Sequence, residues 1–214
     1  MEFILSIDGG GTKLRAVLFD DEYQLLGQGI SGGVNINQTT LEDSRANVVD
    51  CLSQVFNGKP KMHIDRLYIV FVGPVEILYE ELAKYATVGE IISLGEAKAG
   101  LLAGAMYEEG ILALAGTGSD VFYVRKEPGL NSVVGVWGPI LGDQGSGTWI
   151  GQKALQAVVA AIEGWGEQTM LNDLISQEWK LKKKFDMVHI IHRSPAPFRV
   201  VASVTPLVGK AAYA

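Results

Sequence analysis

A short stretch near the start of the chain combines an acid with three consecutive glycines. Asp8, Gly9–Gly11 and Thr12 stand between two apolar runs, Phe3–Ile7 and Leu14–Phe19. The runs are typical of buried strands, and the glycines are typical of a hairpin turn. Such a turn needs only one or two residues with positive φ, so the third glycine indicates that something approaches the backbone. Successive N–H groups in a turn bind anions such as phosphate, and Asp8 is placed to hold a divalent cation beside it. The alternative is a tight turn with a solvated aspartate.

A second glycine turn in mid-chain repeats this arrangement. The apolar run Ile111–Ala115 leads into Gly116-Thr-Gly-Ser119, and the run Val121–Arg125 follows. Each half of the chain therefore has one strand, glycine turn and strand with a hydroxyl residue in the turn, which indicates a duplicated architecture. A glycine-rich loop that contains Asp143, Gly138–Gly147, comes next.

The composition limits the classes of protein to which the chain can belong. Of its 214 residues, 48% are hydrophobic and 20% are charged, as in ordinary globular proteins. The net charge of −6 disfavours nucleic acid as a partner, and the run Lys180–Lys184 is expected to be a solvated helix end or loop. Cys51 is the only cysteine, so neither an internal disulfide nor a cysteine-rich metal site can form. No apolar run reaches the ~18 residues of a membrane helix, the start of the chain lacks the basic region of a signal peptide, and a cytoplasmic location is expected.

Strands and helices alternate along the chain, which predicts an α/β fold that joins antiparallel hairpins to parallel crossovers. The first helix is expected to begin with a capping box, either Thr40 with Asp43 or Thr39 with Glu42. Cys51 lies on or beside the apolar stripe of this helix, so it is expected to be a small buried residue rather than a reactive thiol. The expected strands are residues 3–7, 14–19, 24–30, 67–72, 90–94, 111–115, 121–125 and 133–137, with a turn at Pro128-Gly129, and further helices are expected at about 74–85, 96–107, 148–162, 169–179, 185–191 and 198–213.

Three motifs occur in a fixed order along the chain: Asp8-Gly-Gly-Gly-Thr12, Gly116-Thr-Gly-Ser119 and Trp137-Gly-Pro-Ile-Leu-Gly-Asp143-Gln-Gly145-Ser. In this order they resemble the actin-like ATPase superfamily of sugar kinases, Hsp70 and actin, and within it the N-acetylglucosamine kinase and BadF/BadG/BcrA/BcrD ATPase family. The resemblance covers essentially the whole chain. It implies a ribonuclease-H-like, actin-type ATPase fold with two lobes around a cleft. Residues 1–108 would form the first lobe, and residues 109–214 would begin a second lobe that is left incomplete.

The resemblance also implies roles for the residues of these motifs. Asp8 would lie near Mg²⁺ and hold it through a water molecule. A sugar would be bound by Asp143, with Gln144 beside it, and by an asparagine after the third strand. Asn35 matches that asparagine by position and Asn37 is a close competitor, while plain loop chemistry is the alternative for both. The residues expected to bind the ATP phosphates are Gly9, Gly10, Gly11, Thr12, Lys13, Gly116, Thr117, Gly118 and Ser119.

The catalytic base that the resemblance implies is an aspartate at a strand end, just before an Ala/Gly-rich helix. The matching stretch Ile91–Gly100 contains no aspartate, and Glu96 stands at or beside the expected place. A glutamate can accept the proton, but its extra methylene moves the carboxylate by ~1 Å or more, which can cost ~10²-fold in rate. Glu96 is therefore the expected catalytic residue, either as a base for a differently placed hydroxyl or as a sign that kinase activity has drifted. The alternative is a carboxylate favoured at a helix start by the helix dipole.

The resemblance implies ATP-dependent phosphorylation of an amino sugar or hexose hydroxyl. ATP and Mg²⁺ would be the cofactors and a small-molecule sugar the partner, in a protein compatible with a homodimer. One alternative is a BadF-type ATPase that activates a reductase or dehydratase, whose iron–sulfur cluster takes cysteines from two subunits. Another is a non-catalytic sugar or nucleotide sensor. Family members carry a further stretch, after the helix that begins near Phe198, with a Gly-Gly turn that binds adenosine. No such motif precedes Ala214, so the adenosine site is expected to be incomplete.

Overall fold

The chain folds into two compact units, Met1–Ala103 and Gly104–Ala214. The computed structural model describes residues 1–125, 132–183 and 185–213. In these ranges, no helix is both long enough and apolar enough to cross a membrane.

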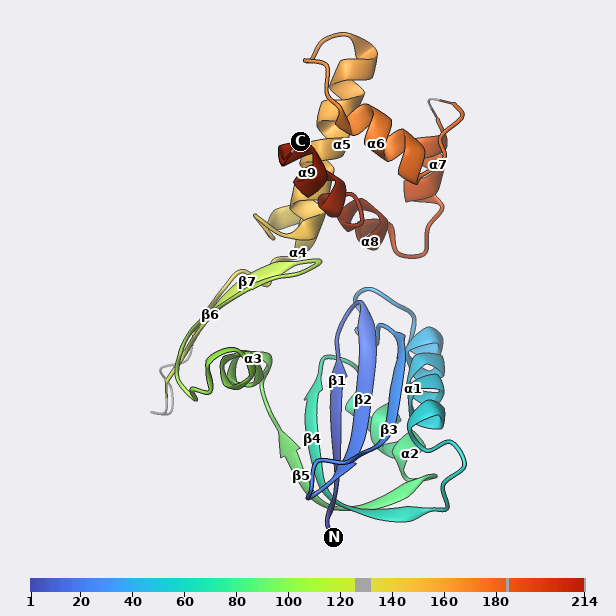
Figure 1. The fold of residues 1–214 in the computed structure, drawn as a ribbon, viewed down its shortest axis with the longest axis vertical. Coiled ribbons are helices and arrows are strands. Elements are labelled where there is room, and N and C mark those ends of the chain that lie inside the picture. Colours follow the sequence, from blue (N-terminus) through green and yellow to red (C-terminus); the bar gives the residue numbers. More distant parts are fainter. Residues whose placement is uncertain (126–131, 184, 214) are drawn as a thin grey trace. The chain divides into compact units, whose positions relative to one another are not determined.

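The first unit is built on a five-stranded mixed sheet (Figure 1). Its central strand β1 (Phe3–Gly9) pairs antiparallel with β2 (Lys13–Asp20), which pairs antiparallel with β3 (Leu25–Gly32). On its other side, β1 pairs in parallel with β4 (Met62–Phe71), and β4 pairs in parallel with β5 (Ala86–Ser93). The order β3-β2-β1-β4-β5 places the carboxyl ends of three parallel strands at one edge of the sheet.

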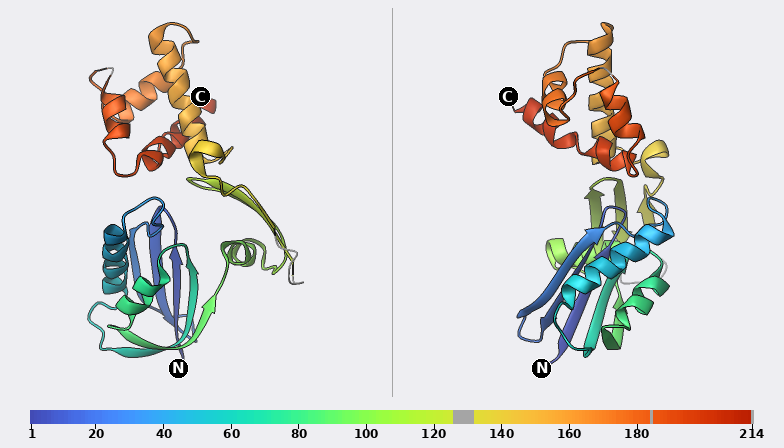
Figure 2. Two further views of the ribbon diagram at one scale, coloured as in Figure 1. Left: turned by 180° about the vertical axis from the view of Figure 1, so that it is seen from behind. Right: turned by 90° about the vertical axis from the view of Figure 1, so that its right-hand side faces the viewer.

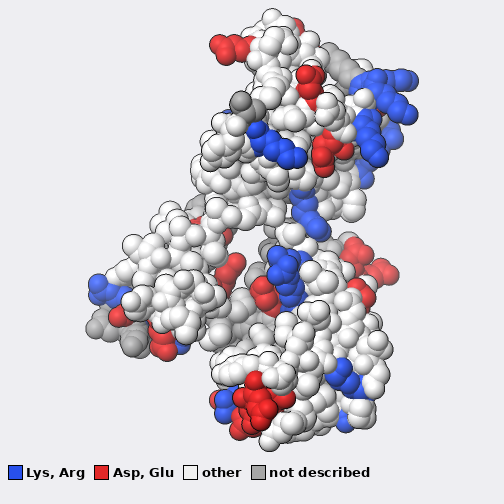
Figure 3. Space-filling model, viewed as in Figure 1, with Lys and Arg blue, Asp and Glu red and all other residues white. Residues whose placement is uncertain are grey.

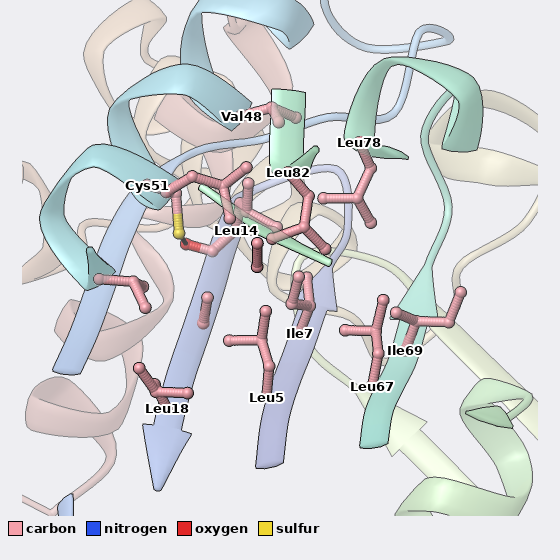
Figure 4. Packing of buried hydrophobic residues seen from close by; sticks show 14 of the residues in the cluster. Leu5, Ile7, Leu14, Leu18, Val48, Cys51, Leu67, Ile69, Leu78 and Leu82 are labelled. Atoms are coloured by element: carbon pink, nitrogen blue, oxygen red, sulfur yellow. Dashed lines mark hydrogen bonds between the residues drawn. The ribbon is translucent and has the colours of Figure 1, made fainter. Parts of the chain in front are cut away.

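Helices α1 (Leu41–Val55) and α2 (Val75–Leu82) pack against one face of this sheet (Figure 2). Strand residues two apart point to the same face, and Leu5 and Ile7 of β1 are both buried there. Each large side chain that is removed fully from water contributes about 1.5–3 kcal/mol to folding. The labelled members of this core in Figure 4 are Leu5, Ile7, Leu14, Leu18, Val48, Cys51, Leu67, Ile69, Leu78 and Leu82.

Helix α1 begins with one of the two predicted caps. The Thr40 hydroxyl accepts a hydrogen bond from the Asp43 N–H (3.0 Å) and donates one to the Asp43 carboxylate (2.8 Å), so this pair is confirmed. Cys51 is confirmed as a buried residue, with 0% of its surface exposed and its Sγ 4.0 Å from the Leu14 carbonyl oxygen (Figure 4). Burial raises the pKa of the Cys51 thiol to about 11.

Strands of the second unit form a small antiparallel sheet in the described part of the chain. It consists of β6 (Gly110–Ala115), β7 (Ser119–Val124) and β8 (Ser132–Val134), in that order. Apolar side chains of this sheet remain open to solvent, among them Ile111 (70% exposed) and Val134 (73% exposed). Helix α3 (Glu96–Ala105) connects β5 to this part of the chain.

Helices make up the rest of the second unit and share a core of their own. The long helix α5 (Gly147–Glu163) contributes Val158, which packs with Ile175 and Val204, all of them 0% exposed. The remaining helices of this group are α6 (Leu171–Glu178), α7 (Asp186–His192), α8 (Pro197–Ala202) and α9 (Thr205–Ala212).

The lysine-rich run between α6 and α7 is a loop, as predicted for its described residues. The backbone N–H groups of Lys182 and Lys183 donate to the Asp186 carboxylate at 2.8 and 2.9 Å, which lowers the pKa of Asp186. Figure 3 shows basic side chains gathered near α7 on the face that it draws, with acidic side chains beside them. The run Lys180–Lys183 therefore leads into α7, and its backbone is tied to the first turn of that helix through Asp186.

Several predicted elements differ from the structure. The strands expected to begin at residues 67 and 90 begin earlier, at Met62 and Ala86. The loop expected at residues 138–147 begins with a short helix, α4 (Gly138–Leu141). The strand expected to reach residue 137 ends at Val134, because Gly135 (φ 115°) and Val136 (φ 57°) adopt backbone conformations that cannot continue a ladder. The single helix expected at 198–213 is wrong: the chain forms α8 and α9, because Pro206 lacks an N–H and its ring blocks a continuous helix. The expected Pro128-Gly129 turn lies outside the described residues.

Candidate active site

The first glycine turn connects β1 to β2 and is held from three sides. The Gly10 N–H donates to the Lys13 carbonyl oxygen (3.0 Å), which closes the turn. The Gly9 carbonyl accepts from Val72 (2.9 Å), and the Gly10 carbonyl accepts from Val34 (2.8 Å). Within the described ranges the Gly11 N–H has no acceptor, and a Cβ on Gly10 would meet no atom within 4 Å. The turn therefore has its carbonyl groups tied down and an open side that presents an N–H donor, which suits an anion.

Asp8 and Gln38 flank this turn. Asp8 is exposed at the carboxyl end of β1, next to the turn. Gln38 lies over the turn, because a Cβ on Gly11 would come within 2.1 Å of its Oε1 atom. Gln38 could not be predicted from the sequence, since a lone amide in an Asn-rich loop has no diagnostic spacing. Its carboxamide adds a second polar group above the open turn.

Asn35 and Asn37 lie in the segment that follows β3 and reaches the glycine turn. The Asn35 Oδ1 atom accepts a hydrogen bond from the Asn37 N–H (3.0 Å), and the Asn35 carbonyl accepts from Gln38 (2.9 Å) and Thr39 (3.0 Å). This is the loop chemistry that the sequence offered as an alternative. It uses the oxygen of the Asn35 carboxamide, and Asn37 is exposed farther along the chain.

Glu96 lies at the same edge of the sheet as Asp8. It is the first residue of α3 and follows β5, whose end is tied to the sheet by a hydrogen bond from the Leu94 N–H to the Ile69 carbonyl (2.8 Å). Strands β1 and β5 are separated only by β4, so the carboxyl ends of β1, which contains Asp8, and of β5, which precedes Glu96, are about 10 Å apart. Both carboxylates are exposed. The first unit thus places the glycine turn, Asp8 and Glu96 at one edge of its sheet, with Asn35 in the segment that reaches the turn.

The second glycine turn connects β6 to β7 and packs against the start of α5. The Gly116 N–H donates to the Gly118 carbonyl (2.8 Å), and a Cβ on Gly116 would again meet open space. The Thr117 carbonyl accepts from the Thr148 N–H (3.2 Å) and hydroxyl (2.7 Å). The Ser119 hydroxyl donates to the Gln144 carbonyl (2.9 Å). The second unit therefore brings Gly116–Ser119, Asp143 and Gln144 together as one structure.

Asp143 is the buried carboxylate of this group. Only 7% of its surface is exposed, its φ is 60°, and a Cβ on Gly118 would lie 2.8 Å from its Oδ2 atom. Burial raises the pKa of Asp143, the backbone N–H of Ser119 opposes that rise, and the charge of Asp120 adds to it. Asp120, which the sequence did not single out, accepts a hydrogen bond from the Val136 N–H and so fixes the residues that follow β8.

A divalent cation would find only a sparse set of protein ligands. Among the described residues, no group of three or more His, Cys, Asp or Glu side chains lies close enough together to hold a metal ion. Mg²⁺ commonly takes one or two carboxylates and completes its shell with phosphate oxygens and water. The exposed Asp8 carboxylate beside an anion-binding turn fits that chemistry.

Comparison with known proteins connects this geometry to a family. The model of the BadF/BadG/BcrA/BcrD ATPase family matches residues 5–212. An N-acetylmuramic acid/N-acetylglucosamine kinase from Clostridium acetobutylicum is 30% identical over 219 residues, which cover 99% of this chain and 71% of that protein. The glucosamine kinase GspK of Vibrio cholerae is 29% identical over 82% of this chain, and the chain spans 60% of its length.

A solved structure shows the same fold. It is that of a Chromobacterium violaceum protein named provisionally as an N-acetylglucosamine kinase, and it matches with a TM-score of 0.74 at 24% identity. The match covers 100% of this chain and 75% of that protein. The mixed α/β architecture is therefore that of the actin-like ATPase kinases, as the sequence predicted.

Proposed function

Since the chain belongs to the BadF/BadG/BcrA/BcrD ATPase family, which implies ATP binding, we propose that it is an ATP-dependent kinase of N-acetylglucosamine or a related amino sugar. One observation carries the proposal: Asp8, the first glycine turn and Glu96 share a single edge of one sheet. Phosphoryl transfer needs a phosphate-binding element, a cation and a group that accepts the proton of the nucleophile. These residues supply all three.

Each group at this edge has one role in the proposed reaction. The sugar hydroxyl oxygen attacks the γ-phosphorus of ATP, the bond from that phosphorus to the bridging oxygen of ADP breaks, and Glu96 accepts the hydroxyl proton. The Gly11 N–H donates to a phosphate oxygen and stabilises its charge. Asp8 would hold Mg²⁺ through a water molecule, and the bound ion would supply positive charge beside the phosphates.

Each unit, taken by itself, has further polar groups that would bind sugar hydroxyls or phosphate oxygens. The Asn35 amide, with Asn37 nearby in sequence, donates to a sugar hydroxyl. Asp143, assisted by Gln144, accepts from another hydroxyl, and its burial strengthens that hydrogen bond because little water competes. The turn Gly116–Ser119 binds phosphate oxygens, and Lys13 and Thr12 do so in the first turn.

The sole cysteine argues against the iron–sulfur activator that the sequence left open. Cluster ligands are thiolates that face the metal, whereas Cys51 is 0% exposed in the core between α1 and the sheet. A raised pKa of about 11 also keeps its thiol protonated at neutral pH. The kinase and the sensor remain the two functions to separate.

An assay with several sugars distinguishes a kinase from a sensor. The folded chain is assayed for ADP release with Mg²⁺, ATP and N-acetylglucosamine, N-acetylmuramic acid, glucosamine or glucose, and the sugar phosphate is identified by mass spectrometry. We expect ADP release that depends on an amino sugar and equals the sugar phosphate formed. A ligand-dependent rise in Tm without turnover would instead support a sensor.

A further inference from the structure

The segment that carries Asn35 is pressed against the first glycine turn. The Val34 N–H donates to the Gly10 carbonyl oxygen at 2.8 Å. Gly33 lies so close to Gly11 that a Cβ on Gly33 would be 2.1 Å from the Gly11 carbonyl oxygen. Any shift of residues 33–35 would therefore change the distance between Asn35 and the turn.

Helix α1 holds the other side of this segment through two side chains. The Asn47 Nδ2 atom donates to the Gly33 carbonyl (2.8 Å), and the Ser44 hydroxyl donates to the Val34 carbonyl (3.1 Å). Ser44 is 0% exposed, and residues three apart lie on one face of a helix. The Ser31 hydroxyl in turn donates to the Asn47 carbonyl (2.7 Å). Two consecutive carbonyl groups, just past the end of β3, are thus fixed by side chains of α1.

Ordinary docking of α1 on the sheet does not require these two contacts. Val48, Cys51 and Leu52 already bury the apolar face of the helix in the core. Farther along α1, the Gln54 carboxamide makes the same kind of contact with β3: its Oε1 accepts from the Ile30 N–H (3.1 Å) and its Nε2 donates to the Ile30 carbonyl (3.0 Å). Gln54 therefore ties α1 to β3 without touching the segment that reaches the turn.

We propose that Ser44 and Asn47 are positioning residues that lock residues 33–35 onto the first glycine turn and so set the distance between sugar and ATP phosphates. The inference rests on the proposed kinase function. Neither side chain touches substrate. They act through the backbone of Gly33 and Val34, which contact Gly11 and Gly10 directly. A misplacement of about 1 Å at the reacting atoms can cost ~10²-fold in rate.

A matched pair of variants tests this role. Asn47→Asp keeps the size of the side chain but replaces the Nδ2 donor by an oxygen that faces the Gly33 carbonyl. Gln54→Glu makes the same chemical change, on the same helix, opposite the Ile30 carbonyl. Both variants add one negative charge and lose one donor to a backbone carbonyl. Asn47→Asp should cost more stability, because Asn47 is half-buried and Gln54 is exposed, so turnover is compared at a temperature well below the Tm of both variants.

The readouts are kcat, KM for sugar, the ratio of ADP released to sugar phosphate formed, and hydrogen exchange of the Val34 amide. We expect Asn47→Asp to lower kcat at least ~10-fold, to raise the ADP ratio because water replaces a misplaced hydroxyl, and to speed Val34 exchange. Gln54→Glu should leave all four near wild type. Ser44→Ala should repeat the Asn47→Asp pattern.

Three results overturn the inference. The first is an Asn47→Asp enzyme with wild-type kcat and ADP ratio, and the second is one whose losses Gln54→Glu reproduces. The third is unchanged exchange of the Val34 amide in Asn47→Asp, which would show that the segment is not held by Asn47 even if the chain is no kinase. Failure of the kinase proposal itself appears separately, as a wild-type chain without sugar-dependent ADP release.

Discussion

Asp8, Glu96 and Asp143 are carboxylates in contrasting surroundings. Asp8 and Glu96 are exposed at the carboxyl edge of the first sheet, where a cation or a hydroxyl can reach them. Asp143 is 7% exposed, and its carboxylate accepts a hydrogen bond from the Ser119 N–H. Burial raises the pKa of Asp143. An exposed carboxylate suits proton transfer and metal binding, whereas a buried one suits recognition of a hydroxyl, because its orientation is fixed.

Glu96 is the residue on which turnover is expected to depend. Glu96→Gln keeps the shape of the side chain and removes its ability to accept a proton, so kcat should fall ~10²–10⁴-fold with little change in KM for ATP. Steady-state ADP release measures this. Glu90→Gln, at an exposed position within β5, is the control and should behave as wild type. Equal rates for Glu96→Gln and wild type would remove Glu96 from the mechanism.

Cys51 makes the stability of the chain depend on pH. Its pKa is about 11 in the folded protein against 9.0 for an ordinary thiol, so above pH 9 the unfolded chain loses this proton first. The unfolded state then binds fewer protons, and the free energy of unfolding falls as pH rises from about 9 to 11, by up to about 3 kcal/mol. Urea unfolding of wild type and Cys51→Ala across this pH range measures the difference. A constant difference would show that the thiol does not titrate in this way.

At the scale of elements, α5 and α8 approach each other unusually closely. A Cβ on Gly151, in the interior of α5, would lie 2.0 Å from the Val201 carbonyl oxygen of α8. Gly209 in α9 has open space at the same position. Both glycines lie in helices, where each disfavours the helix to a similar extent. Only Gly151 lies where a side chain would collide with a neighbouring helix.

Alanine substitution at these two glycines should change the free energy of unfolding in opposite directions. Gly209→Ala should stabilise the protein by about 0.5–1 kcal/mol, because alanine favours the helix. Gly151→Ala should destabilise it by about 1–3 kcal/mol, because the added methyl forces the two helices apart. Chemical denaturation of the two variants measures both. Stabilisation by Gly151→Ala would mean that α8 does not pack on this part of α5.

Strands and helices that are marked by a run or stripe of apolar residues could be predicted from the sequence. Boundaries that depend on the backbone conformation of a single residue could not. The apolar runs of β1 and β2 and the Thr40 cap of α1 predicted the boundaries of these elements to within about two residues. The break between α8 and α9 was missed because the apolar spacing continues through Pro206. Among the proposed site residues, motif order pointed to Asp8 and Asp143, and the strand end before the Ala/Gly-rich helix pointed to Glu96; these roles stay predictions. Gln38, Asn47 and Asp120 act through contacts between distant segments, for which one sequence carries no signal.

At the scale of the whole molecule, each unit has its own core. The buried cluster of the first unit is drawn wholly from residues 5–86, and that of the second from residues 154–207. We therefore predict that residues 1–103 fold without the remainder of the chain. Near-UV circular dichroism and urea unfolding should show a cooperative transition for this fragment. A fragment that lacks fixed tertiary structure would show that the first unit depends on the second.

The central claim is that the first glycine turn binds ATP phosphates for transfer to a sugar, and Asp8→Asn tests it most directly. This change removes the charge proposed to hold Mg²⁺ while keeping the size of an exposed side chain. Asp21→Asn is the control, because Asp21 lies just past the end of β2, where its N–H donates to the Glu2 carbonyl (3.0 Å) at the opposite end of the sheet. The measurement is sugar-dependent ADP release by the three proteins at saturating MgATP. We predict a loss of at least ~10²-fold for Asp8→Asn, with its Tm unchanged, and wild-type turnover for Asp21→Asn. Wild-type turnover by Asp8→Asn would contradict the account.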